Sequence, residues 1–176
     1  MSDFLPDILT LEDFNGDFQK LKMKAYSVFQ HDFKNTRPYF YTNPIRLKSG
    51  LDIDGMEPSF WHVISDGPDE SKRTIDLDRI ARVPWIAPII TNFRDSNIRW
   101  YEDSRKGKKS TVLWYVPGDY LVVLEHRNKS LLLQTAYIIK YESKRKKIEK
   151  TYQAYLKSKG RSPQGGAPGT PSTPGR

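Results

Sequence analysis

The side chains best suited to chemistry are one histidine, two arginines and two hydroxyl-bearing residues. They are His62, Arg79, Arg82, Thr135 and Tyr137. A histidine can take up or release a proton near neutral pH, and an arginine presents a fixed fork of donors to phosphate oxygens. Threonine and tyrosine hydroxyls can orient a phosphate or donate a proton. Such a set suits metal-free RNA cleavage, which needs a base for the 2′-hydroxyl proton, an acid for the leaving 5′-oxygen and cations or donors for the phosphorane oxygens.

Other kinds of catalytic site lack their motifs in this sequence. The chain has no cysteine, which excludes disulfides and zinc sites built on thiolates. Its three histidines, His31, His62 and His126, are far apart and show no metal-ligand spacing. There is no glycine-rich phosphate loop and no Gly-x-Ser-x-Gly nucleophile motif. We therefore expect neither a metal site nor a cofactor.

Each candidate residue also has a purely structural interpretation. His62 follows a tryptophan in the segment SFWHVIS, which fits a core histidine on either a short strand or a turn of helix. Thr135 is β-branched and therefore typical of a strand. Arg79 and Arg82 share a face of a short predicted helix and could pair with the aspartates of that helix. His126, near the end of a predicted strand, fits an exposed bystander.

The first half of the chain is predicted to be mainly helix and loop. Between residues 17 and 35 the apolar residues recur at spacings of three and four, which predicts a one-sided helix. The loop that follows contains scattered proline and glycine and is expected to hold one short strand at 45–48. A second, short helix is predicted at 74–82, with Thr74 or Asp76 as its N-cap.

The second half changes to a period of two. Four segments rich in β-branched and aromatic residues predict strands at 98–102, 110–116, 120–127 and 131–139. Their connectors are too short for parallel crossovers, so the strands should form an antiparallel meander. A helix is predicted at 141–159. The expected fold is of the α+β class, with N-terminal helices packed on a four-stranded antiparallel sheet and followed by a basic C-terminal helix.

The last predicted hairpin sets which side chains share a face of the sheet. A two-residue turn at Asn128-Lys129 would pair Arg127 with Ser130. With a regular register this predicts the further pairs His126–Leu131, Val122–Thr135 and Tyr120–Tyr137. His126, Thr135 and Tyr137 would then share one face, and Glu125, Arg127 and Gln134 the other, because side chains alternate along a strand.

The positive charge of the chain is concentrated near its C-terminus. The net charge is +8, and the stretch from Lys140 to Arg161 contains nine lysines and arginines against two glutamates, which is +7. A solvated helix face is one interpretation, but so many cations cannot all pair with two carboxylates. An anionic partner such as nucleic acid is the other interpretation. The candidate nucleic-acid-binding residues are Lys144, Arg145, Lys147 and Lys150.

Composition also defines the extent of the folded region. Residues 1–159 are predicted to form a single domain, whereas 160–176 consist mainly of glycine, proline, serine and threonine and are predicted to be disordered. No run of 18 apolar residues exists, so we expect no membrane span. The N-terminal segment is acidic and does not resemble a signal peptide. These features predict a cytoplasmic protein, or one delivered there.

The order of several segments resembles a phage and mobile-element nuclease family. That family belongs to the barnase–EndoU–colicin–RelE-like (BECR) ribonuclease group, which includes tRNA-cleaving colicins and ribosome-dependent mRNA interferases. The resemblance runs from about residue 44 to residue 155. The segments that carry it are FWHVIS, LDRIARVPWIAPII, IRWYED, VLWYV, YLVVLEHR and LLLQTAYIIKYESKRKKIEKTY.

The resemblance implies an active site on the open face of the sheet and metal-independent RNA cleavage that leaves a cyclic phosphate. By analogy, His62 would act as general base or acid, and Arg79 and Arg82 would hold the phosphate. Thr135 and Tyr137 match the pair on the last strand of the family. RNA would be the substrate, whether tRNA, mRNA or rRNA, in a toxin-like or phage host-takeover role. An inhibitor or immunity protein is a further implied partner.

Two other functions fit the same sequence. A non-catalytic nucleic-acid-binding module would use the basic helix together with aromatic residues of the predicted strands, on which bases can stack. The aromatic residues concerned are Trp100, Trp114, Tyr115 and Tyr120. A host-protein interaction factor would instead have one stoichiometric protein partner that survives nuclease treatment.

Overall fold

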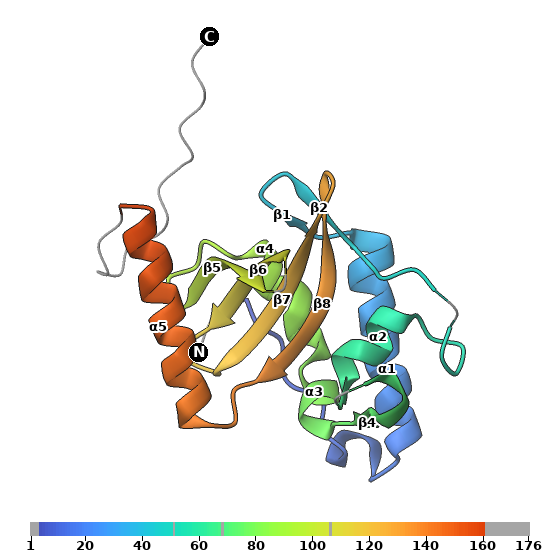
Figure 1. The fold of residues 1–176 in the computed structure, drawn as a ribbon. Coiled ribbons are helices and arrows are strands. Elements are labelled where there is room, and N and C mark those ends of the chain that lie inside the picture. The colour runs from blue at the N-terminus through green and yellow to red at the C-terminus, as the bar shows by residue number, and fades with distance from the viewer. Residues whose placement is uncertain (1–3, 51, 68, 106, 161–176) are drawn as a thin grey trace.

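A computed structural model describes residues 4–50, 52–67, 69–105 and 107–160 (Figure 1). The predicted disordered tail lies outside the described residues from position 161 onward. The α-helices are α1 (Phe18–Gln30), α2 (Pro58–Ile64), α3 (Leu77–Ala81), α4 (Ile86–Thr91) and α5 (Glu142–Ser158). Short 3-10 helices span Glu12–Phe14, Glu70–Lys72 and Val83–Trp85, and a π-helix spans His31–Thr36.

The strands form one curled six-stranded sheet and one small hairpin. The sheet contains β1 (Tyr39–Phe40), β2 (Asn43–Arg46), β5 (Ile98–Arg105), β6 (Lys108–Tyr115), β7 (Tyr120–Arg127) and β8 (Ser130–Ile138). Their order across the sheet is β1-β2-β8-β7-β6-β5. The hairpin pairs β3 (Ser65–Asp66) with β4 (Thr74–Ile75).

The α+β class is confirmed, but the prediction of a four-stranded sheet was wrong. The strands β5 to β8 pair antiparallel in chain order, as the short connectors predicted. The segment before α2 adds β1 and β2, and β2 pairs with β8 in parallel. Such a parallel pair needs a long crossover, and the whole stretch from α2 to β7 supplies it. The pattern of residues within the four-residue strand β2 does not predict that it pairs with a strand as distant in sequence as β8.

The helix α1 forms where the apolar pattern predicted it. Asp17 caps its N-terminus by accepting a hydrogen bond from the backbone N–H of Lys20 at 3.1 Å. Leu21, Ala25 and Phe29, spaced by four, are all buried. The helix continues as the π-helix and ends at Arg37, one residue before a proline.

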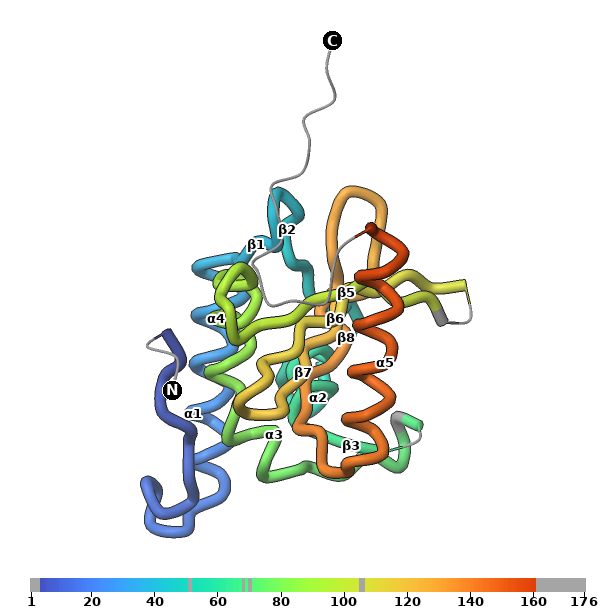
Figure 2. The backbone as a smooth tube through the Cα atoms, turned by 90° about the vertical axis from the view of Figure 1, so that its left-hand side faces the viewer, coloured from blue at the N-terminus to red at the C-terminus, as the bar shows by residue number. Residues whose placement is uncertain are grey.

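Helices cover both faces of the sheet (Figures 1 and 2), and each face carries a hydrophobic core. The larger core lies between the sheet and the helices α1 to α4, and contains Phe29, Phe60 and Ile90 together with Leu113 and Val122 from the sheet. On the other face, α5 packs over the strands on the β5 side. That second core contains Tyr101, Val112, Trp114, Leu121, Ile139 and Ile148. The part of this face near β8 is therefore not buried under α5.

A β-bulge overturns the register predicted for the last hairpin. The pairs Arg127–Ser130 and His126–Leu131 are as predicted, but the register shifts between the pairs Leu124–Leu133 and Val123–Thr135. Gln134 is the bulged residue. Beyond it, every side chain of β8 points to the face opposite to the one predicted.

The bulge separates His126 from the two β8 candidates. His126 shares a hydrogen bond of 2.8 Å with Thr111 on β6, on the side of the larger core. Thr135 and Tyr137 point to the α5 side, since Ala136 between them is part of the larger core. The predicted grouping of His126 with Thr135 and Tyr137 was therefore wrong, because one inserted residue inverts a period-two pattern.

Candidate functional site

The position of His62 is set by the short helix α2. Pro58 occupies the first turn, where its missing N–H costs no hydrogen bond. Phe60, Val63 and Ile64 are buried and fix the inner face of the helix. His62 points away from these residues, is only half-buried and lines two cavities. The His62 side chain is therefore not part of the hydrophobic core and is partly accessible from the two cavities.

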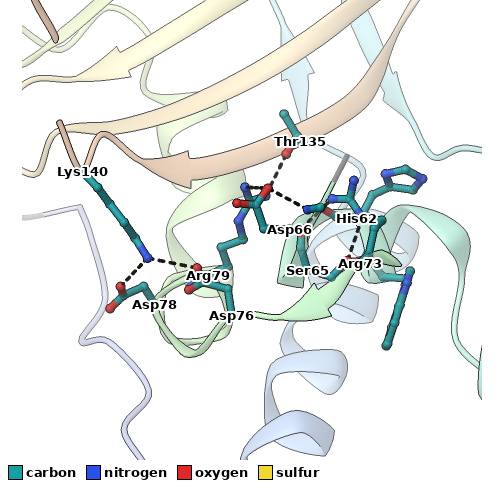
Figure 3. A network of polar contacts seen from close by, with 11 residues as sticks. His62, Ser65, Asp66, Arg73, Asp76, Asp78, Arg79, Thr135 and Lys140 are labelled. Atoms are coloured by element: carbon teal, nitrogen blue, oxygen red, sulfur yellow. Dashed lines mark hydrogen bonds and ion pairs between the residues drawn. The ribbon is translucent and has the colours of Figure 1, made fainter. Parts of the chain in front are cut away.

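The larger of the two cavities brings most of the predicted catalytic residues together. It has a volume of about 530 Å³ and is open to solvent. Four of the five residues line it, namely His62 from α2, Arg79 from α3, and Thr135 and Tyr137 from β8. Figure 3 shows Arg79 reaching up to Thr135, with His62 on one side of this contact and Lys140 on the other.

Arg79 is the most firmly held side chain of this cavity. Its residue is buried, its Nη1 donates to Thr135 Oγ1 at 3.2 Å, and its Nη2 lies 3.0 Å from Asp66 Oδ1. The guanidinium carbon lies 5.3 Å from the centre of the Tyr137 ring, within cation–π range. A guanidinium has five N–H groups, so these contacts leave donors for a ligand. The guanidinium is therefore held in a fixed orientation with N–H groups to spare.

Arg82 lies outside the cavity, although its spacing from Arg79 predicted a common face. Its Nη1 donates to the carbonyl oxygen of Asp78 at 3.2 Å, and its guanidinium lies 5.3 Å from the ring of Trp85. The helix α3 ends at Ala81, so Arg82 is already its C-cap and no longer continues the helical face. The Pro84 that follows makes that early end unavoidable.

The small β3–β4 hairpin supplies two groups that the sequence reasoning missed, Asp66 and Arg73. Arg73 Nη2 donates to the carbonyl oxygens of Ser65 at 2.6 Å and His62 at 3.1 Å, and so ties the hairpin to α2. A Cβ on Gly67 would lie 2.7 Å from the carbonyl oxygen of Lys72, so only glycine permits this close approach. Two-residue strands leave no periodic signal, which is why the sequence did not reveal them.

A lysine contacts the imidazole of His62. Lys48 Nζ lies 3.3 Å from His62 Nε2, and the backbone N–H of Lys48 donates to Ser59 Oγ at 2.6 Å, which fixes the lysine beside α2. A charged ammonium has donors and no acceptor. The contact places a cation directly beside the imidazole of His62.

The far side of the larger cavity is closed by a lysine–aspartate network. Lys140 Nζ lies 3.1 Å from Asp76 Oδ2 and 3.1 Å from Asp78 Oδ2 (Figure 3). Burial opposes the ionisation of Asp76, but hydrogen bonds from Lys140 and from the backbone N–H of Arg79 outweigh it and hold the pKa of Asp76 below its usual 3.8. The same network raises the pKa of Lys140. Asp76 is also the N-cap of α3, so it fixes the helix that carries Arg79.

The shifted pKa of Asp76 predicts a pH-dependent stability. Because the folded pKa lies below the unfolded value, the ionised carboxylate stabilises the fold above about pH 4, and this contribution is lost as the pH falls further. Asp76→Asn keeps a cap acceptor but removes the charge, and should lower the free energy of unfolding by about 0.5–1 kcal/mol at pH 7. Urea titrations of both proteins at pH 7 and pH 3 check this. A difference that stays the same at both values would contradict it.

The basic helix does not present all of its cations to the same surface. Lys144 lines the larger cavity, with its Nζ 4.1 Å from the centre of the Tyr137 ring. Arg145 Nε instead lies 2.9 Å from Asp119 Oδ1, an ion pair that attaches α5 to the β6–β7 turn. Lys147 and Lys150 are exposed along the helix. Of the predicted nucleic-acid-binding residues, only Lys144 lines the cavity that contains His62.

Two general features are absent from the described residues. In the part of the chain set out above, no group of three or more histidine, cysteine, aspartate or glutamate side chains could hold a metal ion. Within the same residues, no helix is both long and apolar enough to cross a membrane.

Comparison with known proteins identifies no relative of this chain. No protein-family model, no curated protein and no solved structure matches this chain. The nuclease resemblance drawn from the sequence motifs therefore remains a prediction.

Proposed function

We propose that this protein is a metal-independent endoribonuclease whose active site is the cavity between α2, α3 and β8. The observation that carries the proposal is that His62, Arg79, Thr135 and Tyr137, selected from the sequence for this chemistry, line one solvent-open cavity. They come from three different elements, α2, α3 and β8. The sequence resemblance to the BECR group implies the same reaction.

The reaction assigns one task to each group. His62 takes the proton of the 2′-hydroxyl, whose oxygen then attacks phosphorus and forms the 2′-O–P bond. Arg79, held by Thr135, binds the non-bridging phosphate oxygens and stabilises the charge that builds on them. The P–O5′ bond breaks, and the Tyr137 hydroxyl supplies the proton that the leaving oxygen needs. The products are a 2′,3′-cyclic phosphate and a free 5′-hydroxyl.

Lysines beside this centre extend the proposed phosphate-binding surface. Lys140 and Lys144 line the same cavity, and neighbouring phosphates of an RNA chain carry one negative charge each. Asp76 and Asp78 hold Lys140 in place, which reduces the entropy that the side chain loses when it binds. Together with Arg73 and Arg79, these lysines give the cavity four cations against the three aspartates Asp66, Asp76 and Asp78.

A second candidate function is RNA binding without cleavage. It is favoured by the exposed cations of α5, Lys147 and Lys150, which continue the basic surface beyond the cavity. This function predicts salt-dependent binding that is unchanged when His62 is replaced.

The test separates these functions through the 2′-hydroxyl. Purified protein is incubated in EDTA with total tRNA and with ribosomal RNA, and separately in a magnesium buffer with 70S ribosomes carrying mRNA, and the ends of any products are sequenced. We expect cleavage that leaves a 2′,3′-cyclic phosphate, and no cleavage at the same site when that nucleotide carries a 2′-deoxyribose. Binding without any cleavage would support the second function, and cleavage of the deoxy substrate would rule out the proposed mechanism.

A further inference from the structure

A second cavity continues the proposed active site along β8. It has a volume of about 140 Å³ and shares His62 and Gln134 with the larger cavity. We call the two cavities together the β8 groove. His62 thus lies at the junction of the groove. Arg79 and Lys140 line the larger cavity (Figure 3), and a second set of polar side chains lines the smaller one.

The second cavity has its own anchored cations. Its charged lining comprises Lys48, Lys108 and Arg127 against one carboxylate, Glu125. The Glu125 side chain is only 7% exposed, and its Oε1 lies 2.9 Å from Arg127 Nη2 and 3.8 Å from Lys108 Nζ. The side chains of both cations are more than half exposed. A buried carboxylate therefore holds two cations at the solvent boundary of a cavity in which the positive charge is in excess.

An exposed aromatic ring lies at the opposite end of the groove. Tyr141 lines the larger cavity and is 71% exposed. It is the N-cap of α5 and lies outside the core beneath that helix. Lys140 and Lys144 line the same cavity. Exposed aromatic rings among cations are the usual platform on which proteins stack unpaired bases.

We infer that the β8 groove binds single-stranded RNA with nucleotides on both sides of the scissile phosphate. One base stacks on Tyr141, the scissile phosphate lies between His62 and Arg79, and a phosphate on the other side binds Lys108 and Arg127. The identification of the ligand as RNA depends on the proposed function. A duplex does not fit this assignment, because its bases already stack on one another and expose no face to Tyr141.

Binding can be measured without cleavage. The probe is a fluorescein-labelled hexauridylate with 2′-O-methyl groups, which cannot form a cyclic phosphate, and the readout is fluorescence anisotropy. Tyr141→Ala should weaken binding about 5- to 100-fold, whereas Tyr141→Phe should bind like the wild type, since stacking needs the ring and not the hydroxyl. Tyr39→Ala is the matched control, because Tyr39 is also exposed but lies on β1.

The second cavity is tested through the salt dependence of the same probe. Lys108→Gln should lower the slope of log affinity against log salt by about 0.7, the value for one lost phosphate contact on a single strand. Lys24→Gln is the charge-matched control, because Lys24 is exposed on α1 and lines neither cavity. Glu125 keeps its pairing with Arg127 in the Lys108 variant, so the fold should be retained.

The outcomes separate this inference from the proposed reaction. Loss of affinity in the Tyr141 and Lys108 variants, with weaker binding of a duplex of the same length, supports the groove even if no RNA is cleaved. Equal binding of duplex and single strand would overturn it. So would no binding at all, or variants that bind like their controls, even if the protein cleaves RNA in a His62-dependent way.

Discussion

Replacing His62 by alanine should lower the rate of RNA cleavage about 10²- to 10⁴-fold, the usual contribution of a positioned general base. His62 is the one titratable side chain that lines both cavities, and its Nε2 lies 3.3 Å from Lys48 Nζ. The packing of α2 depends on Phe60, Val63 and Ile64, so the variant should fold normally. Single-turnover cleavage in EDTA measures the effect, and thermal denaturation verifies the fold.

The matched control for this variant is His31→Ala. His31 is largely exposed, lies in the π-helix after α1 and pairs only with its neighbour Asp32 among the described residues. This substitution should change the cleavage rate by less than about twofold, since surface substitutions away from a site have little effect. Equal rates for the two variants would show that His62 takes no part in the reaction. A His62 variant that loses both activity and its thermal transition would instead show a structural role.

How far the sequence predicts this fold depends on how local each interaction is. The helix α1 could be predicted because Leu21, Ala25 and Phe29 repeat within a few residues, and the meander could be predicted because short turns permit only antiparallel pairs. The parallel pairing of β2 with β8 joins two segments that lie far apart in the sequence. This pairing is stabilised by packing of the whole core, so the residues of either strand alone do not predict it.

The bulge at Gln134 shows how one residue limits a prediction about side-chain direction. The segment LLLQTAYII has the composition of a regular strand, and a bulge changes neither its propensity nor its length appreciably. Yet the bulge moves Thr135 and Tyr137 to the face that carries the groove and leaves His126 on the other. Without it, the Thr135 hydroxyl and the Tyr137 ring would not face Arg79.

The candidate residues could be selected from the sequence by their side-chain chemistry. The residues that hold them in position could not. The chemistry of His62 and Arg79 can be inferred from their side chains alone. Asp66 and Lys140 reach the cavity only because a two-residue hairpin and the segment after β8 place them there. Such short elements carry too few residues for a periodic signal, and their positions depend on packing against the rest of the molecule.

Arg79 and Arg82 offer the sharpest test of the site, because the sequence presents them as equivalent and the fold separates them. Arg79→Gln should lower the cleavage rate about 10²- to 10³-fold, the range for removing one donor that stabilises a developing oxyanion. The fold should lose only about 1–2 kcal/mol, because the variant breaks two hydrogen-bonded contacts and leaves behind Asp66, whose side chain is mostly exposed. Single-turnover rates at saturating protein and urea titrations give the two quantities separately.

Arg82→Gln removes the same charge three residues later and serves as the matched control. Its guanidinium contacts Asp78 and the ring of Trp85 outside the cavity, so the variant should lose about 0.5–1 kcal/mol of stability and less than about threefold in rate. Arg79→Lys should recover only part of the activity, because a lysine keeps the charge but not the fork that contacts Thr135 and Asp66 together. If both glutamine variants lose activity equally, the positive charge of α3 as a whole matters and the assignment of the phosphate to Arg79 is wrong. If only Arg79→Gln is inactive, the fold selects between two arginines that the sequence cannot distinguish.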